Sequence, residues 1–579
     1  MSTEPHSRRE FLGLAGAGLA GMVGSTRSGE RASAQVGPDG PELVVLNANV
    51  HTVDETNAHA EAFAVKNGRF VAVGSTADVR NLAGSGTEIR NARGTTIVPG
   101  FIDCHNHAGG ARLLYGVLVG NPFEVEFVTI DSVVRKLRKR AAETPPGAWV
   151  EGIFFDDTKV KGGERLGIDD LDRVSTEHPV VVRHRGGHTA FYNSKAFEMA
   201  GIDEDTPDPR GGTFDRDENG KLNGRVTDRA MGVFQNVGDQ VTFGPKDPLE
   251  RAREGLTYIS KKFVEYGLTG VHHEGGNLRA MQDVRASGDL RHRISYEARG
   301  DLLDAMIDDG IMTRFGDEWI RLGATSEHTA DGSFSERTLA VSTPYSGGDP
   351  HPGHDPPYWG NLTLTQDELN DWVERVHRAG IQVNCHLNGD VAVGMGLTAY
   401  ERAQRLFPWD DHRPKITHCT FTTPELLRRI KAVGAVPAPF TTYAYYNSDK
   451  FHFYGEALMK RAMPFRDFLD AGIPAAAGSD FGPGPFAPLM GIQGMVTRTG
   501  WNGETWGANQ RVTAAEALRI NTLNGAYASY EEDIKGSITP GKLADYVVLA
   551  DDLLAVDPEK IKDIEIVRTV VGGTTVYEA

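Results

Sequence analysis

The middle of the chain repeats one unit, an amphipathic helix followed by a short apolar strand. In one unit, Thr365 and Glu368 form a capping box that begins a helix, and residues 381–386 follow as a strand. The next unit has Thr423 as its helix cap and Gly434 as its stop. Because strands that alternate with helices join parallel sheets, we expect an α/β fold, and the repeated units favour a (β/α)8 TIM barrel. A doubly wound open sheet is the alternative, but the chain lacks a Gly-rich phosphate loop.

Both ends of the chain carry short strand-like segments, and neither end is large enough to build a stable core alone. We therefore expect residues 35–97 and 536–579 to pair into one small β-sandwich domain. Residues 98–535 then form the barrel. The stretch within about 110–265 is too long for one connection between a strand and a helix, so it predicts an insertion that helps to wall the pocket.

The first 34 residues predict export from the cytoplasm. A twin-arginine pattern at residues 7–12 precedes an apolar run at 11–24 that is too short to span a bilayer. Small residues at 32–34 then provide a cleavage site. Residues 1–34 thus predict a twin-arginine signal peptide and a periplasmic or extracellular protein. The alternative is a leader that contains a chance arginine pair.

The charge of the chain bears on its partners. A formal net charge of −18 argues against nucleic acid, because phosphates would be repelled. Hydrophobic residues at 39% and charged residues at 24% are ordinary for a soluble protein. We expect a small-molecule substrate, no nucleic acid and no stable membrane insertion, and a homodimer is compatible with the sequence.

Histidines and a carboxylate stand where several predicted strands end. His105 and His107 share one face of a strand, about 7 Å apart along the chain, and such a pair can bind one metal ion. Later segments end in His386, His418 and Asp480. Barrel enzymes draw their catalytic residues from the carboxyl ends of several strands. These residue types are the expected ligands of zinc or a similar divalent ion.

The motifs around these residues resemble the amidohydrolase superfamily and, more narrowly, its YtcJ-like branch. The resemblance runs from about Pro41 to the C-terminus. It is carried by ordered motifs: PGFIDCHNH at 99–107, GHTAFYNS at 187–194, DGS at 331–333, HLNGD at 386–390, GSD at 478–480 and PGKLAD at 540–545. It implies a metal-dependent hydrolase that acts on carbon–nitrogen bonds other than peptide bonds.

The resemblance also assigns roles to the residues. It implies that His105 and His107 bind the more buried ion, that His386 and His418 bind the second, and that Asp480 both ligates metal and acts as general base. A bound divalent ion lowers the pKa of water to near 7, and Asp480 can accept the water's proton and return it to the leaving amine.

The bond that is cleaved is then an amide, an N-acyl or N-formyl group, or a cyclic amide. Two alternatives stay open. One is an ester or lactone hydrolase with the same site. The other is a non-catalytic exported binding protein with a degenerate metal site.

One position departs from the resemblance. Similar proteins carry a lysine four residues before the Asp-Gly-Ser motif, and its carboxylated side chain bridges two metal ions. This chain has Glu327 there. Glutamate already carries a carboxylate, but its stem is shorter. Glu327 could bridge two ions, bind one ion of a mononuclear site, or mark a site that has decayed; we expect the first.

Two further residues are predicted to contact substrate. By the resemblance, His188 hydrogen-bonds the substrate, although it could instead order a loop beside Arg183 and Arg185. Tyr443 belongs to an aromatic-rich segment at 440–454 that follows a predicted strand. This segment predicts a lid or pocket wall for an apolar substrate, or else an aromatic minicore that anchors a long loop.

Other candidates are predicted to be structural. Cys104, Cys385 and Cys419 each adjoin a histidine on a strand, so their side chains point to the opposite face and are expected to be small buried apolar groups. Asp331 and Asp390 are expected to order turns and helix starts. His184, His272 and His273 are weaker site candidates.

Overall fold

The computed structural model describes residues 40–345 and 357–579. The predicted signal peptide, residues 1–34, lies outside the described residues. Within the described ranges no helix has both the length and the apolar character needed to cross a membrane.

Two four-stranded parallel sheets lie in the middle of the chain. The first has the order β17-β16-β15-β8 and the second β18-β19-β20-β21. Their strands are β8 (Phe101–Asn106), β15 (Leu268–Glu274), β16 (Arg293–Ala298), β17 (Ile320–Thr325), β18 (His328–Thr329), β19 (Asn384–Leu387), β20 (Lys415–His418) and β21 (Val436–Ala438). The expected α/β fold with parallel sheets is confirmed.

Isolated parallel bridges connect the two sheets. Ala324 pairs with Gln382, which joins the end of β17 to the segment before β19. The segment 478–481 pairs through Gly478 with Phe440 and through Phe481 with Asn106, so it lies between the segment after β21 and the end of β8. The carboxyl ends of all these strands therefore meet on one face.

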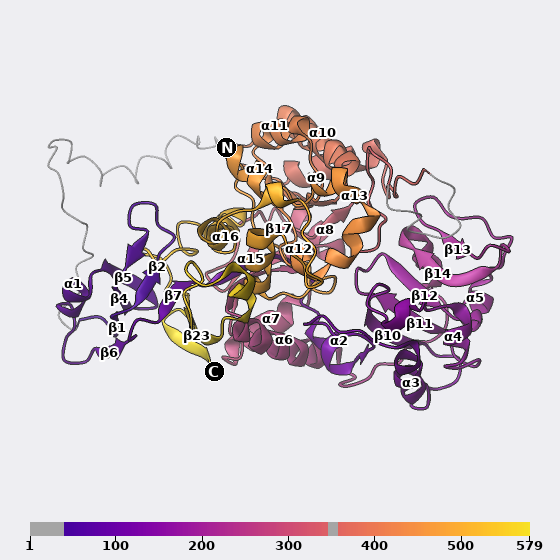
Figure 1. Cartoon of the computed structure of the whole chain (residues 1–579), viewed down its shortest axis with the longest axis horizontal. Helices are drawn as coiled ribbons and strands as arrows, with labels where there is room; N and C mark the ends of the chain where they lie inside the picture. Colours follow the sequence, from indigo (N-terminus) through magenta and orange to yellow (C-terminus); the bar gives the residue numbers. More distant parts are fainter. Residues whose placement is uncertain (1–39, 346–356) are drawn as a thin grey trace, which may run out of the picture.

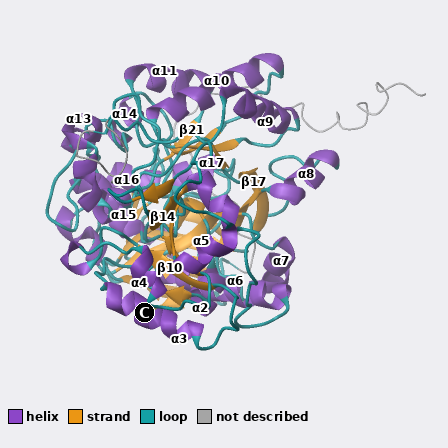
Figure 2. Ribbon diagram, turned by 90° about the vertical axis from the view of Figure 1, so that its right-hand side faces the viewer, coloured by secondary structure: helices purple, strands orange, loops and turns teal. Residues whose placement is uncertain are grey.

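Helices lie between the strands, and two of them begin at the caps that the sequence predicts. They include α6 (Pro248–Glu265), α7 (Leu278–Ala286), α8 (Gly300–Asp308), α9 (Gln366–Arg378), α10 (Asp390–Leu406) and α11 (Pro424–Val433). Thr365 caps α9 in a capping box with Glu368, and Thr423 caps α11. Gly434 ends α11 at φ 68°, a left-handed conformation that glycine adopts without steric cost. In Figure 2 the strands lie toward the middle and helices surround them.

The two chain ends meet in one sheet. Near the N-terminus, β7 (Thr96–Pro99) pairs antiparallel with β22 (Tyr546–Leu549). That sheet has the order β24-β23-β22-β7-β2-β3, and a second sheet has the order β5-β4-β1-β6. The remaining strands of the first sheet are β2 (Asn49–His51), β3 (His59–Ala60), β23 (Ile566–Val571) and β24 (Thr574–Glu578). The strands of the second sheet are β1 (Leu43–Leu46), β4 (Ala62–Lys66), β5 (Arg69–Gly74) and β6 (Glu88–Asn91).

The two end sheets share one hydrophobic core. Phe63 of β4 packs against Tyr546 of β22, with ring centroids 5.0 Å apart, and Val50 and Val570 belong to the same core. The ends therefore bury their apolar surface against each other, which neither could do alone. The domain boundaries proposed from the sequence stay predictions.

A further sheet lies inside the range where the sequence predicts an insertion. Its order is β13-β14-β12-β11-β10-β9. Its strands are β9 (Val117–Leu118), β10 (Val150–Phe155), β11 (Val180–His184), β12 (Thr189–Tyr192), β13 (Phe214–Arg216) and β14 (Leu222–Thr227). Figure 1 shows this sheet at one end of the long axis and the sheets of the chain ends at the other.

Candidate metal centre and active site

The carboxyl ends of the parallel strands bring the predicted metal-binding side chains together. His105 lies on β8 and His107 follows it, His386 lies on β19, and His418 ends β20. Two groups of side chains there could hold a metal ion, with ligand atoms within 4.8 Å of one another: His105, His107, Glu274 and Glu327 in one, and Glu327, His386 and His418 in the other.

The first group is built around the two histidines of β8. The side chain of His105 is fully buried, whereas 40% of the His107 side chain is exposed toward the cavity. His107 Nδ1 lies 2.8 Å from Glu274 Oε2, and His105 Nε2 lies 3.5 Å from Glu327 Oε2. Both imidazoles and both carboxylates therefore converge on one point.

The second group is organised by a hydrogen bond behind His386. The Nε2–H of His386 donates to the carbonyl of Gly332 at 3.1 Å, so in the neutral imidazole Nδ1 is the nitrogen that can bind a metal. That Nδ1 lies 2.7 Å from His418 Nε2 and 3.3 Å from Glu327 Oε2. Glu327 thus belongs to both groups, the position that a bridging carboxylate needs. The bridge itself stays a prediction.

Asp480 stands beside the first group. Its Oδ1 lies 2.9 Å from His107 Nε2 and 3.3 Å from His105 Nε2. The residue has φ 51°, a left-handed conformation that is costly for a non-glycine residue and that recurs at functional sites. Its N–H donates to the carbonyl of His105 at 2.9 Å. Nearby, Asp103 accepts hydrogen bonds from the backbone and the hydroxyl of Ser479 and so holds this turn against β8.

The site leaves buried acceptor atoms without hydrogen-bond partners. Within the part of the chain that the structure describes, these atoms include His105 Nε2, Glu274 Oε2, Glu327 Oε2 and Asp480 Oδ1, and these four face the same small volume. A buried carboxylate without a cation or a donor is costly. Histidine nitrogens and carboxylate oxygens together suit a divalent ion such as zinc, so the residues present fit a metal.

The carboxylates of the site are held in the ionised form that metal binding needs. Burial alone would raise the pKa of Asp480, but the neighbouring imidazoles of His105 and His107 outweigh it and lower this pKa to about 2. Burial likewise opposes ionisation of Glu327, and the charges of His105 and His386 hold its pKa well below the ordinary value.

A buried ion pair supports His105 from the side away from the cavity. Lys415 donates hydrogen bonds to Glu297 and to the carbonyl of Cys104, and all of these groups are fully buried. Glu297 Oε2 lies 3.8 Å from His105 Nδ1. Groups of this kind orient a metal-binding imidazole and fix which nitrogen carries the proton.

The sequence analysis missed Glu274 and the Lys415–Glu297 pair. A signal for Glu274 was available, because it ends β15 at the same level as the other ligands end their strands. His272 and His273, which precede it, are buried on opposite faces of the strand: His272 Nδ1 lies 3.7 Å from Glu297 Oε1, the acid beside His105, whereas His273 Nε2 lies 2.8 Å from His292 Nε2.

The metal-binding groups open into a cavity of about 490 Å³. Its lining comes from the central strands and from the inserted sheet: Phe154, Arg185 and His188 lie beside His386 and Asp480. The side chain of His188 therefore lies where the predicted substrate contact needs it, and this contact stays a prediction.

His188 is held by hydrogen bonds at two atoms. Its Nδ1 lies 2.8 Å from Asp228 Oδ1, and its backbone N–H donates to Glu336. Burial lowers the pKa of His188, but the hydrogen bond with Asp228 and nearby carboxylates raise it to about 9. His188 thus orders a loop and lines the cavity, and its contact with substrate stays a prediction.

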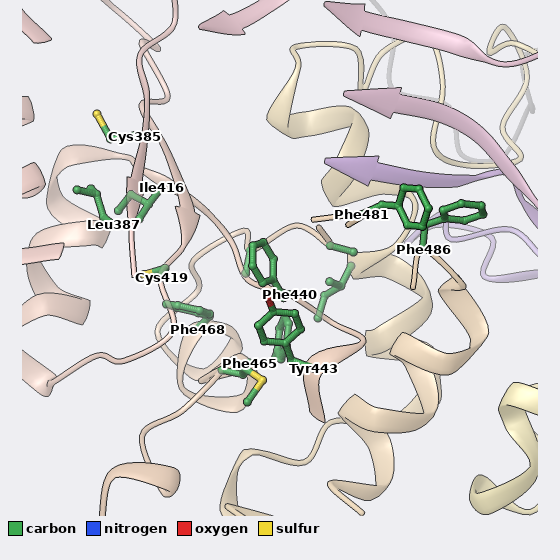
Figure 3. Packing of buried hydrophobic residues seen from close by; sticks show 14 of the residues in the cluster. Cys385, Leu387, Ile416, Cys419, Phe440, Tyr443, Phe465, Phe468, Phe481 and Phe486 are labelled. Carbon is green, nitrogen blue, oxygen red and sulfur yellow. The ribbon is translucent and has the colours of Figure 1, made fainter. Parts of the chain in front are cut away.

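Tyr443 is not brought together with the other predicted site residues. It is buried, its ring packs against Phe440 and Phe334, and it does not line the cavity. Figure 3 shows Tyr443 beside Phe440. Phe451 and Tyr454 extend the same aromatic cluster through Phe334, as an aromatic minicore requires. A substrate contact by Tyr443 stays a prediction that these contacts do not support.

The cysteines are buried and unpaired. In Figure 3, Cys385 lies with Leu387 and Ile416 among buried apolar side chains. Burial raises the pKa of the Cys385 thiol to about 12, so it is not a thiolate ligand at neutral pH. Asp331 accepts backbone hydrogen bonds from Ala340, Asn388 and Gly389, which is the turn-ordering role expected of it.

A parallel α/β core with histidines and carboxylates gathered at its strand ends is the architecture of a metal-dependent hydrolase. The chain belongs to the amidohydrolase family: the model described as "Amidohydrolase family" matches residues 88–577. The resemblance to the YtcJ-like branch is confirmed.

Two relatives match nearly end to end. The chain is 28% identical to N-substituted formamide deformylase of Arthrobacter pascens, over 93% of this chain and 98% of that protein. It is 27% identical to the putative amidohydrolase YtcJ of Bacillus subtilis, over 91% of this chain and 98% of that protein. Among solved structures, an uncharacterized metal-dependent hydrolase of Pyrococcus horikoshii matches with a TM-score of 0.67 and 21% identity, covering 89% of this chain and 99% of that chain.

Proposed function

We propose that this hydrolase is an exported amidohydrolase that cleaves a carbon–nitrogen bond other than a peptide bond, in an amide, an N-acyl or N-formyl group, or a cyclic amide. The observation that carries the proposal is the position of Glu327, whose carboxylate belongs to both ligand groups beside Asp480. The similarity to N-substituted formamide deformylase supports an amide as the scissile group.

The residues that would hold the metal are His105, His107, Glu274, Glu327, His386, His418 and Asp480. Zinc is proposed from the mixture of nitrogen and carboxylate donors. When bound, a divalent ion lowers the pKa of water to near 7 and polarises a carbonyl group.

Asp480 is proposed as the general base and acid. Its Oδ1 faces the cavity between His105 and His107 and has no hydrogen-bond donor of its own among the described residues. It can take the proton from the attacking water and deliver it to the leaving nitrogen. His188 is oriented by Asp228, which leaves its Nε2 able to hydrogen-bond the carbonyl oxygen of a substrate.

We further infer that the central strands close into a (β/α)8 barrel and that the end sheets form a β-sandwich domain. The parallel bridges at Ala324, Gly478 and Phe481 support closure, and the core that β4 shares with β22 supports the sandwich. Residues 1–34 support twin-arginine export to the periplasm or the cell exterior. Measurement of the mass in solution tests whether the protein forms a homodimer.

Metal analysis and a substrate panel test the proposed function. The purified protein is loaded with zinc and offered matched N-formyl amines, other amides, esters and lactones, with and without a chelator. The proposal predicts bound metal and amine release that the chelator abolishes. Turnover of esters or lactones alone would favour the ester alternative. A protein that takes up no metal and cleaves nothing would favour the binding-protein alternative.

A further inference from the structure

We propose that the substrate carries an anionic group, a carboxylate, and that Arg112 binds this group inside the cavity; the inference rests on the proposed function, because it places this charge on the amide that is cleaved. Arg112 lies on the short helix α2 (Gly110–Tyr115), which begins three residues after His107. Both residues line the same cavity. Arg112 would thus determine specificity beside the metal centre.

The guanidinium of Arg112 has N–H donors that are available to a ligand. Arg112 is exposed at the mouth of the cavity that it lines, and among the residues that the structure describes its guanidinium has neither a hydrogen bond nor an ion pair. Burial lowers the pKa of Arg112, and Glu151, the carboxylate that opposes this shift, is already paired with Arg183. A guanidinium presents a planar set of N–H donors that matches a carboxylate with two parallel hydrogen bonds.

The other arginines of the cavity serve as internal comparisons. The donors of Arg185 already have partners within the chain: the carbonyls of Gly482, Asn121 and Pro122 and the hydroxyl of Tyr446. Arg299 lies 3.5 Å from Glu274, and 63% of its side chain is exposed.

The charge of the cavity favours an anion once the metal-binding carboxylates are neutralised. Glu274, Glu327 and Asp480 would be balanced by metal, and Arg112, Arg185 and Arg299 would then give the lining a positive charge. In a chain of net charge −18, such a cavity attracts anions selectively, because its walls concentrate the local field.

The helix that carries Arg112 is fixed in place. A Cβ atom on Gly110 would lie 1.9 Å from the carbonyl oxygen of Gly255, so α2 packs directly on α6 without intervening side chains. Figure 1 shows α2 beside α6, toward the inserted sheet. A donor on a rigid element binds its ligand with less loss of conformational entropy than one on a free loop.

The other residues that line the cavity indicate the chemistry of the rest of the ligand. Phe154 and Phe481, with ring centroids 5.8 Å apart, form an aromatic wall of the same cavity. Phe154 has φ 64°, a strained conformation at this site. An adjoining space of about 210 Å³ shares His107, Arg112 and Arg299 with the cavity. The expected ligand is an amide with an apolar group for the aromatic wall and a carboxylate for Arg112.

A binding experiment tests Arg112 without relying on turnover. The zinc-loaded protein is titrated calorimetrically with 3-phenylpropanoate and with the neutral 3-phenylpropanol, neither of which can be hydrolysed. The proposal predicts that Arg112→Gln weakens binding of the acid by about 10- to 100-fold and leaves the alcohol unchanged, since a charge-assisted pair is lost. Arg112→Lys should retain part of the affinity.

Arg135→Gln is the matched control, because Arg135 is an exposed arginine of α3 (Ile130–Ala141) outside the cavity and has no ion pair among the described residues. This variant should bind the acid like the unaltered protein. If the acid binds equally well to Arg112→Gln, or does not bind the unaltered protein at all, the proposal is overturned.

Kinetics separate this proposal from the proposed function. N-formylphenylalanine and N-formyl-2-phenylethylamine differ by one carboxylate. We expect kcat/KM to favour the acid by at least about 10-fold, and Arg112→Gln to remove this preference. Equal kcat/KM for both would overturn the anion site and leave amide hydrolysis intact. Cleavage of neither, together with Arg112-dependent binding of 3-phenylpropanoate, would overturn the amidohydrolase and leave the anion site intact.

Discussion

Within the described part of the chain, one cluster of carboxylate and histidine side chains at the strand ends and another beside the inserted sheet differ in what neutralises them. At the strand ends, Glu327 and Asp480 are surrounded by imidazoles, and buried acceptor atoms have no donor. In the inserted sheet, Asp156 lies beside His184 but is neutralised by Lys450 Nζ at 2.8 Å and by Lys159 Nζ at 3.1 Å.

The neighbouring carboxylate of the second cluster is also paired within the chain. Asp157 accepts from Arg337, whose guanidinium is buried. Burial alone would raise the pKa of Asp156, and the charges of Lys159 and Lys450 instead hold it well below its ordinary value. The comparison teaches that acids and histidines in proximity do not by themselves define a metal site. Carboxylates that are paired with lysine or arginine side chains form an ion-pair network, whereas carboxylates without such partners can bind a metal ion.

The largest expected effect is on catalysis at the strand ends. Asp480→Asn removes the proposed proton acceptor and should lower kcat by about 100- to 10,000-fold, as the loss of a general base does. The thermal unfolding midpoint of the metal-free protein should change little, because the amide oxygen of the substituted side chain can still face His105 and His107. Steady-state kinetics and calorimetry check both, with the exposed Asp551→Asn as the control. Unaltered kcat would remove Asp480 from the mechanism.

The matching substitution in the other cluster should affect stability instead. Asp156→Asn leaves Lys450 buried beside a neutral amide, while Lys159 keeps Asp449 at 3.1 Å, so the free energy of unfolding should fall by about 3 kcal/mol. Denaturant unfolding measures this. The metal content should stay the same. Loss of metal without loss of stability would mean that Asp156 belongs to a metal site.

Removal of metal should destabilise the protein by an amount independent of the second cluster. A ligand that is present at about 1,000 times its Kd and binds only the native state contributes about 4 kcal/mol, so chelation should lower the unfolding midpoint. The shift should be equal in the unaltered protein and in Asp156→Asn, since distant sites add. A shift that disappears in Asp156→Asn would show that the two clusters form one site.

The smallest effect is expected at the cysteine beside His386. Cys385→Ala removes a buried sulfur atom from an apolar cluster and should cost about 1 kcal/mol of stability. Its metal content and kcat should match those of the unaltered protein. A drop in bound metal would assign the thiol to the metal site and contradict the strand alternation.

The sequence predicts much of the site, because the chemistry recurs at one kind of position. His105, His386 and His418 lie at or near the ends of strands that the local pattern reveals, and parallel strands bring such ends together. Glu274 follows the same rule, but it stands next to two histidines, which are equally good metal ligands in the sequence alone. The capping residues of α9 and α11 are local signals and are confirmed.

Long-range pairing and the direction of loop side chains are not encoded locally. Lys450 reaches Asp156 across 294 positions of sequence, and Lys415 pairs with Glu297 in the core. Nothing near either lysine indicates its partner. The aromatic segment that contains Tyr443 is recognisable, but its composition does not say whether the rings face the cavity or one another; they pack on Phe440 and Phe334.

The count of metal ions per chain tests most directly whether the strand ends, and not the inserted sheet, form the metal centre. Elemental analysis is made on the zinc-loaded protein, on Glu327→Gln and on Asp156→Asn. We expect binuclear occupancy in the unaltered protein and in Asp156→Asn, and the loss of at least one ion from Glu327→Gln, because its carboxylate belongs to both ligand groups. Full occupancy in Glu327→Gln, or metal lost only from Asp156→Asn, would contradict this assignment.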